Sequence, residues 1–341
     1  MRVLIDVSYA KRGPSGTGVY TDALVEALRA EGVDVIEAAR RPRPRGGGGP
    51  RSVLNALSDQ VWTHTALGRH ARTEKPDVVH HPLPAHTTTA IPQVITAHDL
   101  AFERVPDCFD ARFRRYARHA HRSAARHAAH VIVPSEATAA DVRSRWAIPP
   151  EQITVAPHGP GQAIPAGNRG EARHFLYVGD GEPRKNLGRL LIAYAQYRET
   201  ATEPLALILA GRGAPAADAP GVNTHHDPDL PELHRHAAAL VIPSLHEGFG
   251  IPALEAMHAG TPVIAARTAG LAEVCGDAVR FCDPRDPASI ADALADLAAT
   301  PPLREELRRR GEARAAAFSW QRSARAHIAA YEAAVRSRQS A

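Results

Sequence analysis

The chain has 341 residues, a length that favours two domains of about 150 residues each over a single compact domain. Hydrophobic residues make up 44% of the composition and charged residues 23%, which is typical of a globular protein with a full core. The formal net charge of +4 is small for this length, so the charge does not argue for a nucleic-acid partner.

The three cysteines, Cys108, Cys275 and Cys282, show no pairing pattern, so neither a disulfide framework nor a zinc site is expected. No run reaches the ~20 apolar residues that a transmembrane helix needs. Met1–Asp6 leads directly into a strand pattern rather than into a signal peptide. We therefore expect a cytoplasmic protein, and peripheral contact with the inner face of a membrane stays open.

Strand and helix patterns alternate from the start of the chain. Arg2–Ile5 is a short apolar strand pattern, and Val19–Ala30 has apolar side chains at helical spacing. The turn-rich segment Lys11–Gly18 between them predicts a glycine loop. Strand, glycine loop and helix in this order suit a phosphate, because backbone N–H groups gather at a helix N-terminus. A plain tight turn explains the same residues.

Further strands are expected at Asp77–His80, Pro92–Ala97, Val131–Val133 and Ile153–Val155, and Pro92–Ala97 leads into His98. Ala111–His130 has apolar side chains at helical spacing between many Arg and His residues, so it predicts an amphipathic helix. Solvation explains its basic face, and contact with anionic lipids is the open alternative. Ser135 is expected to cap the helix that follows.

The second half of the chain begins after Pro160–Gly170, a linker by its Gly and Pro content. Phe175–Val178 predicts a strand, and Arg184 and Lys185 follow it directly before a helix at Leu187–Tyr197. Arg can bind a diphosphate through two hydrogen bonds, and Lys adds a point charge. This pair of cations at a strand end therefore suits a diphosphate ligand.

Leu205–Ala210 predicts another strand, with its turn at Gly211–Gly213. Asp227 and Asp229 resemble a metal-binding pair, but a helix is expected to begin near Leu230. Helix capping therefore explains the two carboxylates better than a metal does. Three more helices are expected towards the end of the chain, at Pro287–Ala298, Pro302–Ala316 and Gln321–Arg336.

Two glutamates frame a glycine turn in the second half. Ala239–Ile242 predicts a strand and Pro252–Ala259 a helix with Pro at its first position. Glu247 lies in the turn between them, and Glu255 lies in the expected first turn of the helix. Ligands bind at such strand ends in open α/β sheets. Taken alone, Glu255 is also explained by its place near a helix N-terminus, and Glu247 by a solvated loop.

The order Glu247-Gly-Phe-Gly250, Glu255-Ala-Met257 and Gly260-Thr-Pro-Val263 resembles the signature of the retaining family-4 glycosyltransferases. The resemblance implies an α/β protein of the GT-B fold, in which two Rossmann-like α/β/α domains face each other across a cleft. It implies an acceptor-side domain at residues 1–160 and a nucleotide-sugar-binding domain at residues 161–319. A terminal helix at residues 320–341 is expected to pack back onto the first domain.

The resemblance also implies which residues bind the donor diphosphate. The backbone of the glycine loop, Gly16, Thr17 and Gly18, would approach it. Arg184 and Lys185 would supply positive charge. Many members of the family carry an Arg directly after the glycine at the strand end, where this chain has Asp180. Arg184 is therefore expected to serve as the second cation.

The remaining implied roles concern the sugar and the nucleotide. His98 would contact the donor sugar close to its reacting carbon, and a packed histidine bonded to Asp99 is the alternative. The turn at Gly211 would meet the nucleotide base, and Glu255 would bind the ribose hydroxyls. Glu247 would hold the sugar hydroxyls together with the backbone of Gly248, Phe249, Gly250 and Ile251.

The resemblance predicts hexose transfer with retention, without a metal cofactor and without a protein nucleophile. GDP-mannose is the first expected donor, and UDP-GlcNAc or UDP-glucose comes next. The acceptor could be a glycan, a lipid carrier or a small natural product. Arg40–Pro50, a low-complexity stretch, would grip such an acceptor or form a solvated loop, and His80 and His81 could line the acceptor side. A nucleotide-sugar epimerase or hydrolase and a non-catalytic binding subunit are the alternatives.

Overall fold

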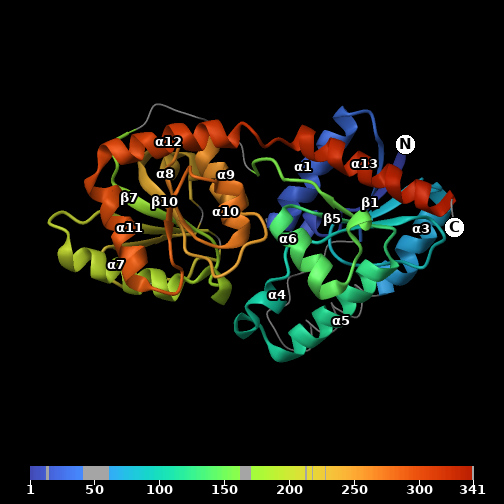
Figure 1. The fold of residues 1–341 in the computed structure, drawn as a ribbon, viewed down its shortest axis with the longest axis horizontal. Coiled ribbons are helices and arrows are strands. Elements are labelled where there is room, and N and C mark those ends of the chain that lie inside the picture. The colour runs from blue at the N-terminus through green and yellow to red at the C-terminus, as the bar shows by residue number, and fades with distance from the viewer. Residues whose placement is uncertain are drawn as a thin grey trace. The chain divides into compact units, whose positions relative to one another are not determined.

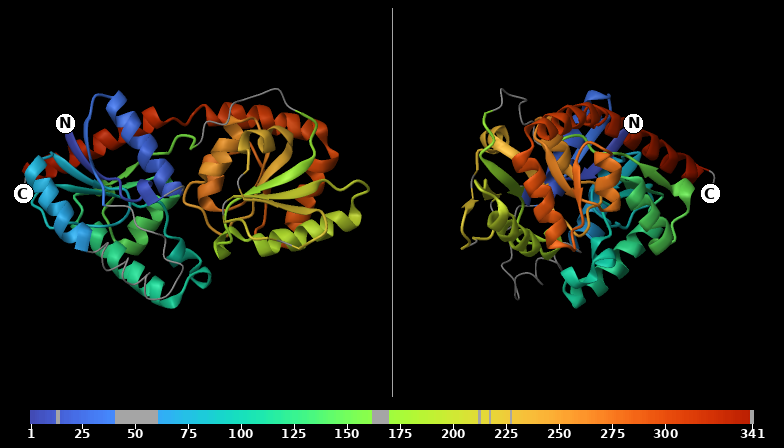
Figure 2. Two further views of the ribbon diagram at one scale, coloured as in Figure 1. Left: turned by 180° about the vertical axis from the view of Figure 1, so that it is seen from behind. Right: turned by 60° about the vertical axis from the view of Figure 1, so that its left-hand side comes forward.

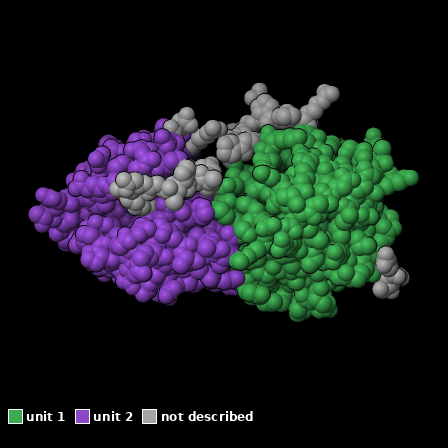
Figure 3. Space-filling model, turned by 90° about the horizontal axis from the view of Figure 1, so that it is seen from above, with its two compact units in different colours: residues 1–100, 112–161, 319–341 green, residues 101–111, 162–318 purple. Residues whose placement is uncertain are grey.

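The computed structural model describes residues 1–12, 15–40, 61–161, 170–211, 213–216, 218–226 and 228–339. Most of the predicted loop Arg40–Pro50 and of the predicted linker lies outside these residues, as does Asp227. The chain divides into two compact units, which Figure 3 colours separately. Unit 1 consists of Met1–Leu100, Arg112–Gly161 and Ser319–Ala341, and unit 2 of Ala101–Ala111 and Gln162–Phe318.

Unit 1 contains a parallel sheet of six strands in the order β2-β1-β3-β4-β5-β6. The strands are β1 (Arg2–Asp6), β2 (Asp34–Ala38), β3 (Val78–His81), β4 (Gln93–Thr96), β5 (His130–Val133) and β6 (Ile153–Val155). The helices are α1 (Gly16–Ala30), α3 (Leu67–Glu74), α5 (Ala111–His127, whose first residue belongs to unit 2), α6 (Glu136–Asp141) and α13 (Trp320–Gln339). Shorter helical turns lie at η1 (Ala10–Arg12), η2 (Trp62–Ala66), η4 (Val142–Trp146) and η5 (Pro150–Gln152).

Helices cover both faces of this first sheet. Side chains alternate along a strand, so Val3 and Ile5 of β1 pack with α1 and α13, while Leu4 packs with α3 on the other face. The first and last long helices of the chain lie side by side (Figures 1 and 2). The last twenty described residues thereby complete a core that the first thirty begin.

Hydrogen bonds link α13 to the sheet through buried side chains. His327 Nδ1 lies 2.7 Å from the Ser323 carbonyl oxygen, and a carbonyl only accepts, so Nδ1 carries the ring proton. His327 Nε2 therefore accepts from Tyr20 Oη, 2.7 Å away. Tyr20 Oη in turn accepts from Thr96 Oγ1 at 2.8 Å. The Ser323 carbonyl thus determines which group donates in each hydrogen bond of this row of buried side chains.

The same row continues to the end of α13. Thr96 Oγ1 accepts from His80 Nε2 at 2.9 Å, and His80 Nδ1 accepts from Tyr331 Oη at 2.8 Å. Each histidine of the row therefore carries one proton and is neutral. Burial lowers the pKa of His327 to about 4 and that of His80 well below its ordinary value.

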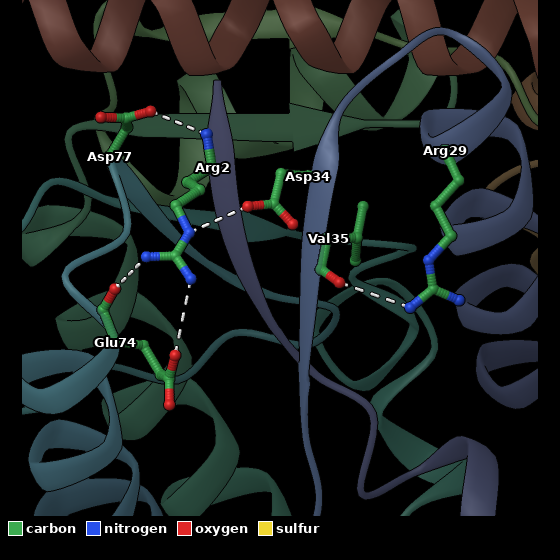
Figure 4. Close-up of polar contacts among 6 residues, drawn as sticks. All are labelled: Arg2, Arg29, Asp34, Val35, Glu74 and Asp77. Atoms are coloured by element: carbon green, nitrogen blue, oxygen red, sulfur yellow. Dashed lines mark hydrogen bonds and ion pairs between the residues drawn. The ribbon is translucent and has the colours of Figure 1, made fainter.

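Charged side chains connect the amino ends of β1, β2 and β3 (Figure 4). Arg2 Nε lies 2.9 Å from the Asp34 carboxylate, and the Arg2 backbone N–H donates to Asp77 at 2.7 Å. Arg2 also donates to the Glu74 carbonyl oxygen at 2.6 Å. These groups are exposed, so each pair contributes at most about 1 kcal/mol.

Unit 2 contains a second six-stranded parallel sheet, in the order β12-β11-β10-β7-β8-β9. Its strands are β7 (His174–Val178), β8 (Ala206–Ala210), β9 (Val222–His225), β10 (Ala237–Ile242), β11 (Val263–Ala266) and β12 (Arg280–Cys282). Its helices are α4 (Ala101–Arg104), α7 (Leu187–Thr200), α8 (Leu230–His236), α9 (Ile251–His258), α10 (Ala269–Cys275), α11 (Pro287–Ala299) and α12 (Pro301–Ala315), with short turns at η3 (Pro106–Cys108) and η6 (Pro183–Lys185).

Both sheets change winding direction beside their first strand. The chain passes from β1 outward to β2 and then returns to β3 on the other side of β1. In unit 2 it passes from β7 to β8 and β9 and returns to β10 on the other side of β7. Ligands of open α/β sheets bind beside such a switch point, at the carboxyl ends of the strands. In unit 2 this position lies between the ends of β7 and β10.

Several local predictions need correction. Gly16, Thr17 and Gly18 are not a loop: they form the first turn of α1, because Ser15 caps the helix by accepting from Gly18 N. The helix predicted at Ala111–His130 ends at His127, and β5 begins at His130. Pro252 is the second rather than the first residue of α9.

Two capping predictions are confirmed. The Ser135 side chain accepts from Thr138 N, and the Asp229 side chain accepts from Glu232 N at the start of α8. Four strands, β2, β9, β11 and β12, were not predicted at all. Within the described part of the chain, no helix has the length and apolar character to cross a bilayer.

Candidate functional site

The loop that follows β7 presents two cations at the switch point of the second sheet. After Val178 the chain turns through η6 and enters α7. Asn186 joins the two helical segments in a left-handed conformation, with φ 62°, which Asn adopts more readily than most residues. Its Nδ2 donates to the carbonyl oxygens of Pro243 at 2.9 Å and Pro284 at 2.6 Å. Asn186 thus fixes the loop after β7 against the loop after β10.

A backbone bond joins the same two loops at the cations themselves. Leu245 N donates to the Arg184 carbonyl oxygen at 2.9 Å. Lys185 Nζ then lies 2.7 Å from Glu247 Oε1, and Arg184 Nη1 lies 3.4 Å from Glu247 Oε2. The structure therefore brings three of the predicted site residues into direct contact.

Glu247 is ionised in this setting. Its side chain is 9% exposed, and burial by itself raises the pKa of a carboxyl group. The charges of Lys185 and Arg184 outweigh burial and lower the pKa of Glu247 to about 2. The carboxylate can accept hydrogen bonds from a ligand but cannot act as a general acid near neutral pH.

Two glycines shape the loop that carries Glu247. Gly250 precedes α9 with φ 98°, and a Cβ there would lie 2.5 Å from Leu271 Cδ2. A Cβ on Gly270 would lie 2.3 Å from the Glu247 carbonyl oxygen, so the start of α10 packs directly against the loop. Phe249 is buried in the core against the Phe318 ring, at 5.7 Å between centroids. Any ligand contact of Phe249 would therefore come from its backbone.

Glu255 lies at the fifth position of α9, beyond the first turn where it was expected. A helix dipole acts mainly within the first turn, so it explains this carboxylate less well than the sequence suggested. Gly211 directly follows β8 with φ 138°, and its N–H donates to the His225 carbonyl oxygen at 3.0 Å. Both residues belong to unit 2, as do Gly248, in the loop before α9, and Ile251, the first residue of α9.

Unit 1 holds the other predicted residues. The Gly18 N–H is already used by Ser15 Oγ at 3.0 Å, so this group serves the helix cap. His98 follows β4, and its Nε2 donates to the Pro82 carbonyl oxygen at 2.9 Å. Burial lowers the pKa of His98 to about 4, so the ring is neutral. The Tyr20 ring packs edge-on against it, with centroids 4.6 Å apart.

Sequence reasoning missed two residues of the unit 2 site. Asn186 was given no role, although its φ angle and two hydrogen bonds place the cations. Glu182 went unnoticed, yet its Oε2 lies 2.8 Å from Arg184 Nε. Among the described residues, no group of three or more His, Cys, Asp or Glu side chains could hold a metal ion.

Two family models match the chain, one in each half. The model described as Glycosyltransferase Family 4 matches residues 14–159, and the model described as Glycosyl transferases group 1 matches residues 164–314. The second match contains η6, Glu247 and α9, and thus the whole cluster at the switch point.

Curated relatives and a solved structure agree with the two family models. O-antigen chain mannosyltransferase B of Escherichia coli is 28% identical over 265 residues, which cover 70% of this chain and 70% of that protein. MMP alpha-(1->4)-mannosyltransferase of Mycolicibacterium hassiacum is 32% identical over 228 residues, which cover 62% of this chain and 56% of that protein. Sucrose-phosphate synthase from Thermosynechococcus elongatus aligns over 97% of this chain and 98% of its own, with TM-score 0.74 and 21% identity. The predicted GT-B fold is confirmed.

Proposed function

This chain belongs to the retaining family-4 glycosyltransferases, and from that premise we propose that it moves a hexose from a nucleoside-diphosphate sugar to a hydroxyl acceptor, with unit 2 binding the donor. The observation that carries the proposal is the contact of Arg184 and Lys185 with the ionised Glu247. It lies where an open α/β sheet binds its ligands, and it offers both cations for phosphate and a carboxylate for hydroxyl groups.

In the proposed reaction the bond from the sugar to the diphosphate breaks, and negative charge grows on the departing phosphate. Preorganised cations stabilise such charge without rearrangement. Arg184 and Lys185 are already oriented by Glu247 and would meet the diphosphate with their remaining N–H groups. The leaving phosphate oxygen would take the proton of the acceptor hydroxyl, so the proposal needs no protein nucleophile.

The donor sugar and nucleotide would occupy the loop after β10. The Glu247 carboxylate would accept hydrogen bonds from sugar hydroxyls, beside the backbone of Gly248 and Gly250. Glu255 would bind the ribose hydroxyls, and the turn at Gly211 would meet the base. From unit 1, the backbone of Gly16 and Thr17 is proposed for the diphosphate and His98 for the sugar, while the Gly18 N–H stays with the helix cap. A neutral His98 fits a hydrogen-bonding role rather than that of a charged group.

GDP-mannose is the proposed donor, because the two curated relatives described above are mannosyltransferases by name. UDP-GlcNAc and UDP-glucose are the next candidates. Thermal-shift measurements with these three nucleotide sugars would rank them. Stabilisation by a UDP-sugar but not by GDP-mannose would overturn the donor assignment and leave the reaction class standing. A glycan, a lipid carrier or a small natural product is proposed as the acceptor.

Two substitutions test the site. Lys185→Ala and Glu247→Ala are each expected to lower turnover by about 100-fold or more, as loss of an electrostatic contact to the transition state does. Arg285→Ala is the matched control, because it removes an exposed cation of the same unit. Circular dichroism would check the fold of each variant. Near-wild-type turnover in Lys185→Ala would contradict the assignment.

The same assay separates the alternatives. An epimerase or hydrolase would convert the donor when no acceptor is present, whereas a transferase consumes it in step with glycosylated product. A non-catalytic subunit would bind the nucleotide sugar and consume none.

Helix α5 is proposed as a contact with an anionic membrane surface. Phe113 and Tyr116 are 46% and 52% exposed, one helical turn apart, and Arg112, Arg115 and Arg118 beside them are also exposed. Exposed aromatic rings with flanking cations suit the interface of anionic lipids. Sedimentation with phosphatidylglycerol vesicles should recover the protein, and Phe113→Ser with Tyr116→Ser should abolish this. Binding unchanged by the double substitution would refute the contact.

A further inference from the structure

Arg184 lies between two carboxylates of different character. Its Nε is 2.8 Å from Glu182 Oε2, and its Nη1 is 3.4 Å from Glu247 Oε2. The Glu182 side chain is 48% exposed, whereas that of Glu247 is 9% exposed. Glu182 is therefore the carboxylate that can turn into solvent at little cost, since exposed ion pairs contribute only about 0.2–1 kcal/mol.

Cations and carboxylates meet in this cluster. Arg184 and Lys185 supply two positive charges, and Glu182 and Glu247 supply two negative charges. A nucleoside diphosphate brings further negative charge to the same place. Glu247 cannot give way, because it is buried and paired with Lys185 at 2.7 Å. Of these two carboxylates, Glu182 is therefore the one that can give way to a diphosphate.

We propose that Glu182 is an exchangeable counter-ion of Arg184, which holds the guanidinium in the free protein and is replaced by the donor diphosphate. The inference rests on the proposed donor site in unit 2. Because the displaced carboxylate competes with phosphate, Glu182 weakens the binding of both donor and nucleoside-diphosphate product. Its competition thereby favours release of the product after transfer.

The test measures the affinity of GDP and UDP by isothermal titration calorimetry. Glu182→Gln keeps the size of the side chain and removes its charge, so the Kd of the bound nucleotide should fall about two- to fivefold. Glu203→Gln is the control, because Glu203 is an exposed carboxylate of the same unit. It should leave the Kd unchanged.

A double substitution distinguishes competition for Arg184 from a general effect of charge. In an Arg184→Met background, Glu182→Gln should no longer improve nucleotide affinity, because the group under competition is gone. Product inhibition of the wild-type enzyme should be weaker than that of Glu182→Gln by the same factor as the Kd. An equal gain in both backgrounds would show a general charge effect and would overturn the proposal.

The failure of this inference differs from that of the proposed function. If wild-type protein binds neither GDP nor UDP, the donor site itself is wrong. If it binds one of them and Glu182→Gln leaves the Kd unchanged or raises it, only the role of Glu182 is wrong. Glu182→Ala provides a second variant should the Gln variant unfold, and the same decrease in Kd is expected for it.

Discussion

Asn186 shows how one side chain can place two others. It is buried, holds a left-handed backbone conformation and donates to two carbonyl oxygens from separate loops. The cations directly precede this anchored residue, and the bond from Leu245 N to the Arg184 carbonyl oxygen ties them to the same loop. Lys185 and Arg184 therefore depend on Asn186 for the geometry that the proposed chemistry needs.

Asn186→Ala is expected to lower the free energy of unfolding of unit 2 by about 2–5 kcal/mol. About 1–3 kcal/mol comes from two carbonyl groups that lose their donor, and about 1–2 kcal/mol from the left-handed backbone. Urea denaturation would measure the change. Asn186→Gly loses the hydrogen bonds but adopts this φ freely, so it should cost less than the Ala variant. Equal losses would mean that the backbone conformation carries no strain.

The residue types of the site were predictable from the sequence, and their pairing was not. Lys185 and Glu247 each belong to a strand end, and the switch-point rule brings such ends together. The ion pair between them joins residues 62 positions apart in the chain. The assigned roles, phosphate for one and sugar hydroxyls for the other, did not suggest that each would orient the other. Glu182 stayed unnoticed because an exposed Glu in a turn has no distinctive pattern.

Among the secondary-structure elements, α1 shows where local rules compete. Glycine at two of the three positions from Gly16 to Gly18 predicts a turn, because each Gly disfavours a helix by about 1 kcal/mol. A Ser cap contributes about 1 kcal/mol in the other direction, and the buried face of α1 adds packing. The helix therefore begins at Gly16. Caps at Ser135 and Asp229 were predictable, since their signal is local and has no glycine to oppose it.

Three of the four strands that sequence patterns missed, β2, β9 and β12, lie at sheet edges, whereas β11 lies inside its sheet. β9 is Val-Asn-Thr-His and alternates half-buried with exposed side chains at the edge of its sheet. β12 is three residues long and also lies at an edge. Such strands form because a neighbour supplies hydrogen bonds, so their own sequence carries little information. The strands that were predicted were located to within one or two residues.

Tyr331→Phe tests the attachment of α13. The change leaves His80 Nδ1 buried without its donor, so it should lower the stability of unit 1 by about 1–3 kcal/mol. Hydrogen exchange should become faster in α13. Tyr116→Phe, at a tyrosine that is 52% exposed, is the matched control and should change stability by less than about 0.5 kcal/mol. Unchanged exchange in α13 would refute the role of the Tyr331 hydroxyl.

Across the whole molecule, acid is expected to act on the two units in different pH ranges. Burial lowers the pKa of several histidines in unit 1, including His98 and His327 to about 4. These rings bind a proton in the unfolded chain below about pH 6.5 but not in the folded unit. Unit 1 is therefore most stable above pH 6.5 and loses stability as the pH falls towards 4.

Glu247 in unit 2 takes up its proton only at a lower pH than that at which the histidines of unit 1 lose their stabilising effect. Its pKa is lowered from 4.5 to about 2, so its contribution is present above pH 4.5 and is lost as the pH falls towards 2. Hydrogen exchange between pH 7 and 5, corrected for intrinsic rates, should show a larger loss of protection in unit 1. Simultaneous loss in both units would contradict this order.

The place of α13 also has a consequence for the newly made chain. Ala330, Tyr331 and Ala334 belong to the buried cluster of unit 1, yet the ribosome adds them after every segment of unit 2. Domains of a growing chain usually fold as soon as their segments are available. Unit 2, although most of it is encoded later, is therefore the first that can fold completely. The apolar face that α13 covers stays exposed until synthesis passes residue 334.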